Sequence, residues 1–355
     1  MLNDLNVLKY TPIMRIISID YLQLYCHAYF LKSNSMFHFE LQHSSSRQFK
    51  RIYKVYDLVT NDHYATVQAE PFSPVIPKHA VIVKIANREL YKKRWAEQVN
   101  YFLNVCFIVP QSVSRLDLCC DFNQFDNNLQ VNTFFDRFLS NKYLKNRLAK
   151  YTLQGEQTDR HQASYIRFGN HDSEVSVYLY NKSLEMREVK TKPYITERWA
   201  ENQLDVNKDV WRLEVSLKST RLKFVVAKTG ELFRIDLEHT ATQGMLENIY
   251  NAIIEKYWDF RVNDGKSRKD RMKKVTFFKS MPTTLIPYSI TEVAGSNRTD
   301  KIVVKKLANV VTELRLDMDQ PSPALEAALW DYIEHKDLKD YYYEKIKPYV
   351  KLFKD

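Results

Sequence analysis

The sequence is poor in glycine, which accounts for only 6 of its 355 residues. Loops that cradle phosphates need glycines because the backbone must approach the phosphate oxygens closely. Neither of the two common phosphate-loop patterns, GxxxxGK[ST] and GxGxxG, occurs in the chain. These absences argue against a nucleotide-hydrolysing motor and against a dinucleotide-binding enzyme.

Cysteine and long apolar runs are scarce as well. The four cysteines contain no CxxC pair, so neither a zinc finger nor a disulfide framework is expected, and a reducing compartment fits. No apolar run approaches the ~18 residues of a membrane-spanning helix. The first residues also lack the pattern of a signal peptide, and no lipidation signal is present. We therefore expect a cytoplasmic protein without a membrane partner.

Positive charge is in excess, since the formal net charge is +10 and the pI is about 9.1. A chain this basic usually works among polyanions, of which nucleic acid is the commonest. The 45% of hydrophobic residues can bury a sizeable core. The composition thus predicts a globular protein that binds nucleic acid.

The order of expected elements indicates an α+β fold with an antiparallel-rich sheet. Strand patterns dominate the first part, with one helix expected over Asn87–Val105 (Asn87 as its N-cap) and another over Val131–Ala149. We expect a core over residues 1–220 and a mainly helical region over 221–355. Helical spacing in that region covers Thr242–Asp259, Lys301–Met318, Pro321–His335 and Leu338–Leu352.

Three segments combine strand periodicity with chemically active side chains: SRLDLCCDF (Ser114–Phe122), VSVYLYNKSLE (Val175–Glu185) and VWRLEVSLK (Val210–Lys218). Alternation along a strand sends successive side chains to opposite faces. A half-exposed strand of an antiparallel sheet is the ordinary explanation of each segment alone. If the three are neighbours, however, one face collects Arg115, Asp117, Cys119 and Asp121 with Tyr178, Tyr180, Lys182, Arg212, Glu214 and Ser216.

Carboxylates gathered on one face suit a metal-assisted attack on a phosphodiester, and their hard oxygen atoms suit Mg²⁺ or Mn²⁺. Asp117 and Asp121 are four residues apart, so their Cβ atoms are about 13 Å apart on a straight strand. We therefore expect one of them to bind the metal together with Glu214. The alternative is a buried structural ion pair, such as Asp117 with Arg212.

A tyrosine is the natural nucleophile when a DNA end must be held covalently and released later. Its pKa of about 10 leaves the phenol mostly protonated at neutral pH, so formation of the reactive phenolate costs roughly 4 kcal/mol. A nearby cation or metal can offset much of this cost. Lys182, Arg115 and Arg212 are the candidates, and they could also hold the phosphate.

A basic segment, DGKSRKDRMKK, runs from Asp264 to Lys274. It is either a solvated helix start or loop, or an element that contacts DNA. If it follows a helix into the major groove, Arg268 and Arg271 contribute to the choice of site. Its candidate DNA-binding residues are Lys266, Arg268, Lys269, Arg271, Lys273 and Lys274.

The three strand segments, in this order and spacing, resemble the signature of the trans-acting Rep family. That family initiates rolling-circle replication of plasmids, and its relatives include relaxases of conjugative elements and phage replication initiators. The matching positions are Arg115, Asp117 and Asp121; Tyr180, Asn181, Lys182 and Glu185; and Trp211, Arg212, Glu214, Leu217 and Lys218. The resemblance covers about residues 16–274, and Cys119–Cys120 departs from the small or apolar pair usual in the family.

The resemblance implies a DNA nickase that also rejoins strands, in which Tyr180 forms a 5′-phosphotyrosine adduct with the help of a divalent metal. Implied partners are origin DNA as duplex or hairpin and as a single strand, a host helicase, and a second copy of the chain. A relaxase for conjugative transfer and a non-catalytic DNA-binding protein are the alternatives. A tyrosine recombinase, for which the run Tyr341–Tyr343 would supply the nucleophile, would require a mostly helical catalytic domain and an Arg-His-Arg type cluster, and no such cluster is evident in the sequence.

Overall fold

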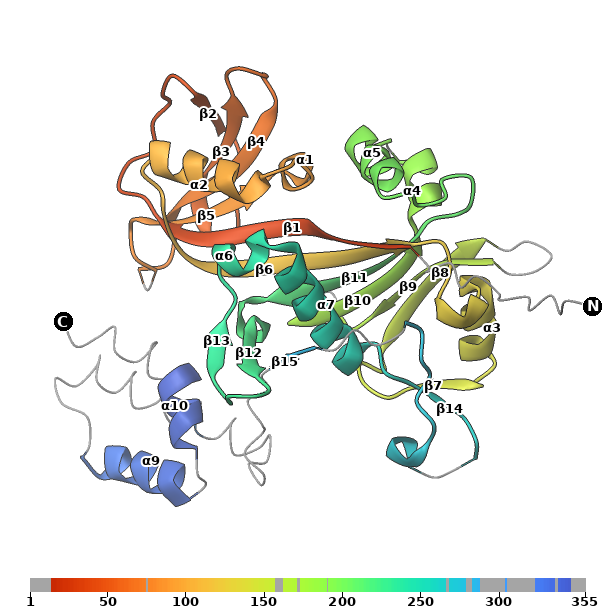
Figure 1. Cartoon of the computed structure of the whole chain (residues 1–355). Coiled ribbons are helices and arrows are strands. Elements are labelled where there is room, and N and C mark those ends of the chain that lie inside the picture. The colour runs from red at the N-terminus through yellow and green to blue at the C-terminus, as the bar shows by residue number, and fades with distance from the viewer. Residues whose placement is uncertain are drawn as a thin grey trace, which may run out of the picture. The chain divides into compact units, whose positions relative to one another are not determined.

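The structure is a computed structural model, shown in Figure 1. It describes residues 14–74, 76–156, 162–170, 173–189, 191–265, 268–278, 283–287, 304, 323–335 and 338–345.

The fold is built on one large antiparallel sheet of ten strands, with the order β2-β3-β4-β5-β1-β6-β11-β10-β9-β8 (Figure 1). Two small sheets, β13-β12-β15 and β14-β7, accompany it. The strands are β1 (Arg15–His27), β2 (Phe37–Gln42), β3 (Phe49–Asp57), β4 (His63–Pro71), β5 (Ala80–Ile85), β6 (Val109–Phe122), β7 (Tyr143–Lys145), β8 (Tyr151–Glu156), β9 (Gln162–Phe168), β10 (Val175–Asn181), β11 (Trp211–Lys218), β12 (Lys223–Val226), β13 (Leu232–Arg234), β14 (Phe260–Val262) and β15 (Leu285–Pro287).

Helices lie on both faces of the central strands, and short 3₁₀ turns connect other elements. The α-helices are α1 (Asn87–Leu90), α2 (Trp95–Val105), α3 (Val131–Leu139), α4 (Lys182–Glu188), α5 (Pro193–Glu201), α6 (Leu237–Ala241), α7 (Gln243–Tyr257), α9 (Pro323–His335) and α10 (Lys339–Lys345). The 3₁₀ turns are η1 (Asp126–Asn128), η2 (Ser219–Arg221) and η3 (Lys269–Arg271).

Helix α7 covers the apolar face of the sheet. Its buried residues Ile249 and Ile253 belong to the same core cluster as Leu213 and Val215 of β11. The Tyr250 hydroxyl also donates a hydrogen bond of 3.0 Å to the backbone oxygen of Leu213. Packing of α7 therefore leaves the opposite face of β6, β11 and β10 for the polar side chains.

The expected α+β class and antiparallel-rich sheet are confirmed, but two expected helices are shorter than predicted. The helix over Asn87–Val105 is divided into α1 and α2, because Arg94 adopts a left-handed conformation at the start of α2. The N-cap of α1 is Ala86 rather than Asn87. The helix over Val131–Ala149 ends at Leu139, because the following residues pair with β14 as strand β7.

The chain divides into two compact units, and the first extends to Tyr288 rather than ending at residue 220. Residues 221–288 belong to it because α7 and neighbouring segments share the sheet's hydrophobic core. This part is also less helical than expected, since β12, β13, β14 and β15 lie within it.

The second unit comprises residues 73–77 and 289–355. In its described part, α9 and α10 form a small cluster in which Leu329, Ile333 and Tyr342 are buried. The two helices fall within the segments Pro321–His335 and Leu338–Leu352 that were expected to be helical. Apart from residue 304, the helix expected over Lys301–Met318 lies outside the described residues.

The turn between β9 and β10 depends on Gly169, which has φ +92°. A Cβ atom there would lie 2.9 Å from the backbone oxygen of Val175. We predict that Gly169→Ala lowers the free energy of unfolding by about 1–3 kcal/mol, because strain and the clash act together. The measurement is urea unfolding of the full chain.

The matched control is Gly244→Ala in α7, where a Cβ meets nothing within 4 Å. Alanine in a helix should leave stability unchanged or raise it by up to about 1 kcal/mol. Equal effects of the two substitutions would contradict the role given to Gly169.

Candidate active site

The sheet brings the three sequence motifs together as adjacent strands. Strand β11 pairs with β6 on one side and with β10 on the other. In this register Arg212 lies directly opposite both Asp121 and Tyr180, while Glu214 lies opposite Cys119 and Tyr178. Cross-strand partners share a face of the sheet, so the carboxylates, the guanidinium group and the tyrosines face the same side.

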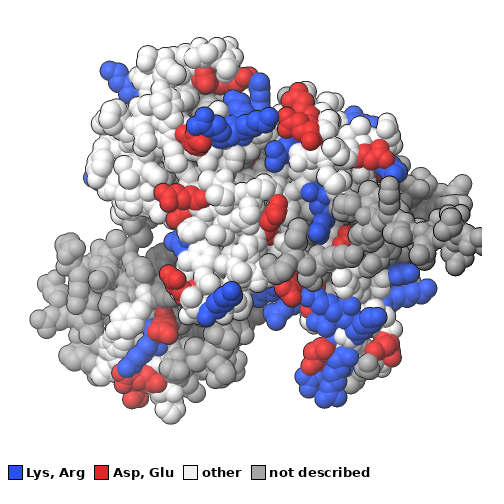
Figure 2. Space-filling view, in the orientation of Figure 1, with Lys and Arg blue, Asp and Glu red and all other residues white. Residues whose placement is uncertain are grey.

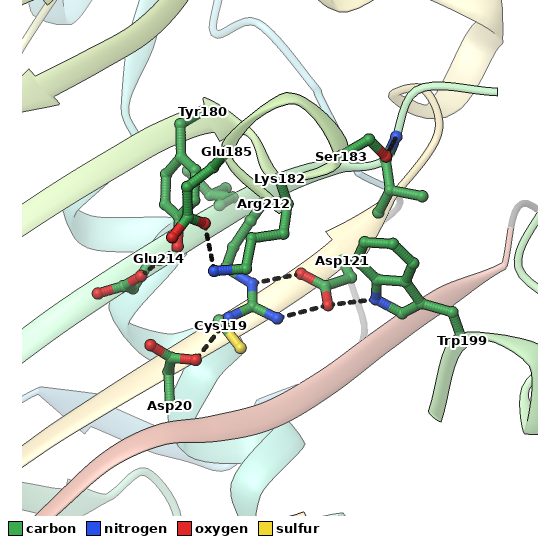
Figure 3. Close-up of polar contacts among 12 residues, drawn as sticks. Asp20, Cys119, Asp121, Tyr180, Lys182, Ser183, Glu185, Trp199, Arg212 and Glu214 are labelled. Atoms are coloured by element: carbon green, nitrogen blue, oxygen red, sulfur yellow. Dashed lines mark hydrogen bonds and ion pairs between the residues drawn. The ribbon is translucent and has the colours of Figure 1, made fainter. Parts of the chain in front are cut away.

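The centre of this face is Arg212, which is completely buried (Figure 3). Its Nε and Nη2 atoms donate to the two carboxylate oxygens of Asp121 at 2.6 and 2.7 Å. Its Nη1 atom donates to Oδ1 of Asp20 at 2.5 Å, and Nη2 also donates to the Tyr91 hydroxyl at 3.1 Å. The bidentate pair is the strong form of an arginine–carboxylate contact.

Asp20 reaches this face through an irregularity in β1. The pairing with β6 shifts between Ile19 and Tyr21, so Asp20 is the extra residue of a bulge. The Asn87 side-chain amide donates to both the backbone and the carboxylate of Asp20. Burial alone would raise the pKa of Asp20, but the charges of Arg212 and Lys182 outweigh it and hold that pKa below its usual value.

Asp121 is held from a second direction by α5. The indole Nε1 of Trp199 donates to Oδ2 of Asp121 at 2.7 Å. Both carboxylate oxygens of Asp121 therefore already accept charge-assisted or indole hydrogen bonds. The buried ion pair considered from the sequence thus involves Asp121, not Asp117, because the register sets Arg212 opposite Asp121.

Tyr180 stands beside this ion pair and contacts a different carboxylate. Its hydroxyl donates a hydrogen bond of 2.9 Å to Oε2 of Glu214 (Figure 3). Burial raises the pKa of the Tyr180 phenol well above its usual value, and the nearby Glu214 charge raises it further. The phenol is therefore protonated and oriented toward a proton acceptor.

Lys182 is positioned by the end of β10. The side chain of Asn181 caps α4 by accepting from the backbone N–H of Leu184 at 2.9 Å, so Lys182 is the first residue of the helix. Its buried ammonium group donates to Glu185 and lies 5.4 Å from the centre of the Tyr180 ring. Burial lowers the pKa of Lys182, and the adjacent Arg212 charge lowers it further.

Glu214 is the carboxylate of this group for which the described residues offer no cationic hydrogen-bond partner. Burial raises its pKa to about 8, and the negative charges of Asp20 and Asp117 contribute. A buried carboxylate in this setting favours either a proton or a metal ion.

Arg115 and Asp117 form a separate pair further along β6. Arg115 donates to the two oxygens of Asp117 at 3.0 and 2.6 Å. Burial raises the pKa of Asp117 even though Arg115 acts against it. The structure thus gathers Tyr180, Lys182, Arg212 and Glu214. Arg115, which was also predicted to be catalytic, pairs with Asp117 instead.

Glu214, Asp20 and Asn87 carry oxygen atoms of the kind that a hard divalent cation prefers. Asn87 Oδ1 is buried without a hydrogen-bond partner, while the amide nitrogen of the same side chain donates to Asp20. Glu214 and Asp20 supply two further oxygens of negative charge. Within the described ranges, no cluster of three or more His, Cys, Asp or Glu is arranged to hold a metal. A metal site here would therefore need the amide oxygen of Asn87 as a further ligand. Asp121 fits less well because both of its oxygens are occupied.

Sequence reasoning did not assign Asp20, Asn87, Tyr91 or Trp199 to the site. Asp20 had a signal, since it is a lone charge within an apolar strand. Tyr91 gave none, because its position on the apolar stripe of an expected helix is typical of packing residues.

The described residues of the basic segment, 264–265 and 268–274, include the 3₁₀ turn η3 but no α-helix, and strand β14 separates them from α7. Strand β14 pairs with β7, which brings the exposed Lys142 and Arg147 into the same region. Figure 2 shows Lys and Arg side chains concentrated where Figure 1 places β7, β14 and η3. Of the predicted DNA-binding residues, Arg268, Lys269, Arg271, Lys273 and Lys274 are exposed, and Lys266 lies outside the described residues.

We predict that Arg212→Met lowers the free energy of unfolding by about 3–5 kcal/mol, because it leaves Asp121 and Asp20 as buried charges without their cation. The matched control is Arg268→Met, which removes an exposed ion pair with Asp270 and should change stability by less than about 1 kcal/mol. Urea unfolding of both variants measures the difference. Equal losses would contradict the central role of Arg212.

A second prediction concerns Glu214 and pH. Its pKa is raised to about 8 in the folded chain. The folded state therefore holds this proton more tightly than the unfolded state, and stability falls as pH rises from the unfolded pKa toward 8. Mg²⁺ binds the ionised form of Glu214, so Mg²⁺ should raise the melting temperature more above pH 8 than at pH 6.

Glu214→Gln should remove this Mg²⁺-dependent shift, whereas the exposed Glu238→Gln should keep it. Thermal unfolding with and without Mg²⁺ measures both. A shift of the same size in Glu214→Gln would show that the metal binds elsewhere.

No family profile and no curated protein matches its sequence. Among solved structures, it is similar to the rolling circle replication initiator protein from Geobacillus stearothermophilus, with a TM-score of 0.44 and 13% identity over 74% of this chain and 93% of that chain. That level of similarity does not establish a shared fold. No described helix is both long and apolar enough to cross a membrane.

Proposed function

We propose that this protein nicks and rejoins a DNA strand, as initiators of rolling-circle replication do, with Tyr180 as the nucleophile. The proposal rests on the Tyr180–Glu214 hydrogen bond of 2.9 Å, in the sequence context that resembles the trans-acting Rep family. A phenol that already donates to a carboxylate has its proton acceptor in place. An acceptor pKa of about 8 is well matched to proton transfer near neutral pH.

In the proposed reaction, the Tyr180 oxygen attacks the scissile phosphate as its proton passes to Glu214. A bond forms between the phenol oxygen and phosphorus, and the bond from phosphorus to the 3′ oxygen breaks. The leaving 3′ oxygen takes up a proton from water and becomes a hydroxyl. The DNA 5′ end remains on Tyr180, and the reverse sequence of steps rejoins the strand.

The cations of the site have different roles in this reaction. Lys182 lies over the Tyr180 ring and favours the negative charge that develops on the phenol oxygen. Arg212 is fully buried and engaged by two aspartates, so it positions the strands rather than receiving a phosphate. Mg²⁺ or Mn²⁺ held by Glu214, Asp20 and Asn87 would stabilise charge on the phosphate oxygens as a Lewis acid.

Recognition of the DNA is assigned to the exposed basic loop, Arg268–Lys274, together with Lys142 and Arg147, which flank β7. Lysine and arginine contacts to phosphates fix the position of the DNA, and additional contacts to base edges would select the site. Replication and conjugative transfer use the same cleavage chemistry, so a relaxase would contain the same site. A tyrosine recombinase is disfavoured because the described catalytic region is a ten-stranded sheet.

The test is incubation of the full chain with supercoiled DNA of its own genetic element and Mn²⁺, followed by denaturing electrophoresis. We predict a covalent protein–DNA adduct for the wild-type chain and none for Tyr180→Phe, which should retain DNA affinity. Tyr178→Phe is the matched control, because Tyr178 lies two residues away on the same face of β10 and should still form the adduct.

If Tyr180→Phe still forms the adduct, another residue is the nucleophile. If the wild-type chain binds its DNA but never forms an adduct, the protein is a non-catalytic DNA-binding protein.

A further inference from the structure

Three positive side chains and one glutamine line up across four adjacent strands, on the same face as Tyr180. In the register of the sheet, Lys84 of β5 lies opposite Gln23 of β1, Gln23 lies opposite Arg115 of β6, and Arg115 lies opposite Lys218 of β11. We call Lys84, Arg115 and Lys218 the cationic row. Its members come from strands far apart in the sequence, so only the folded sheet aligns them.

The ring of Tyr21 holds two members of the cationic row in place. The Arg115 guanidinium lies 4.3 Å from the centre of this ring, and the Lys84 ammonium lies 4.6 Å from it. The Tyr21 hydroxyl donates to Gln23 at 2.9 Å, which fixes the ring between the strands. Cation–π contacts of this kind orient a cation while leaving its outer N–H groups available.

A single neighbouring carboxylate, Asp117, balances only part of the charge of the cationic row among the described residues. Arg115 pairs with Asp117, but among the described residues neither Lys84 nor Lys218 has an ion pair. Arg115 and Lys218 also lie directly opposite each other, and like charges in that position are destabilising. Burial and the Arg115 charge together lower the pKa of Lys84. An anionic ligand would relieve this repulsion.

The position of the cationic row relative to Tyr180 suggests which anion that is. Lys218 is four residues from Glu214 on β11, so the row lies about 13 Å from the Tyr180–Glu214 contact. Lys84 is exposed, while Arg115 and Lys218 are half-buried, and α7 covers the other face of the sheet. The half-buried ring of Tyr165 lies on the same face, next to Tyr180. Phosphate-binding cations alongside aromatic rings are typical of single-strand sites.

We propose that the cationic row binds backbone phosphates of single-stranded DNA beside the scissile phosphate. This inference rests on the proposed function, because it assumes that a DNA strand passes over Tyr180. The row then keeps the cleaved strand in register while its end is covalently attached, so that rejoining is intramolecular.

The experiment measures binding of an uncleaved, fluorescently labelled single-stranded oligonucleotide to the full chain at several salt concentrations. The variant is Lys84→Ala/Lys218→Ala, which leaves the Arg115–Asp117 pair intact. Each lost phosphate contact reduces the slope of log K against log salt by about 0.7 on a single strand. We expect a slope smaller by about 1.4 and an affinity roughly tenfold lower at low salt.

The control is Lys223→Ala/Lys228→Ala, which makes the same charge change on and beside β12, outside the ten-stranded sheet. It should alter single-strand affinity by less than about twofold. Thermal unfolding of both variants reports on folding, and removal of unpaired lysines should not lower the melting temperature.

Equal losses in the two double variants, or no loss in either, would overturn the proposal. A loss as large for duplex DNA as for the single strand would overturn it too, because the row would then be a general DNA clamp. The assay needs no cleavage, so it is separate from the test of Tyr180. If the Lys84→Ala/Lys218→Ala variant selectively loses affinity for the single strand while the wild-type chain forms no adduct, the cationic row is supported as a DNA-binding site and the nicking reaction is refuted.

Discussion

The site depends on one buried charge, the guanidinium group of Arg212. A cation with no exposure to water is tolerated only if carboxylates compensate it from close range. Asp121 does so from the adjacent strand β6, and Asp20 does so from β1 beyond it. Tyr91 of the loop after α1 and Trp199 of α5 complete the set of hydrogen bonds. The charge thus ties three strands and two helical segments into one fixed arrangement.

That arrangement divides the carboxylates by role. Asp121 accepts hydrogen bonds from Arg212 and Trp199, and Asp117 forms an ion pair with Arg115. Glu214 is left with the Tyr180 hydroxyl as its hydrogen-bond donor and with a pKa of about 8. A carboxylate with this environment is available for a proton or a metal, which is what a tyrosine nucleophile needs beside it.

Much of this site follows from alternation along strands, which is a local property of the sequence. Period-2 patterns place Tyr180, Arg212 and Glu214 on polar faces, and their types suggest phosphodiester chemistry. The cross-strand register is not local, so the sequence left open which aspartate lies beside Arg212. Asp117 was the example given for a buried ion pair, and the sheet places Asp121 there instead. The bulge that turns Asp20 inward depends on the pairing of β1 with β6, which the sequence does not reveal. The helix expected to continue to Ala149 ends at Leu139 for the same reason. The residues after it form β7, which pairs with the distant strand β14 through Lys145 and Phe260.

Several tyrosines lie near Glu214, so the identity of the attacking residue is the central claim. The direct measurement is to trap the covalent protein–DNA adduct, digest the protein, and identify by mass spectrometry the peptide that carries the nucleotide. The account predicts a single modified site at Tyr180, which hydrogen-bonds to Glu214. Modification of Tyr178 or Tyr165, whose rings lie on the same face of the sheet, would contradict it.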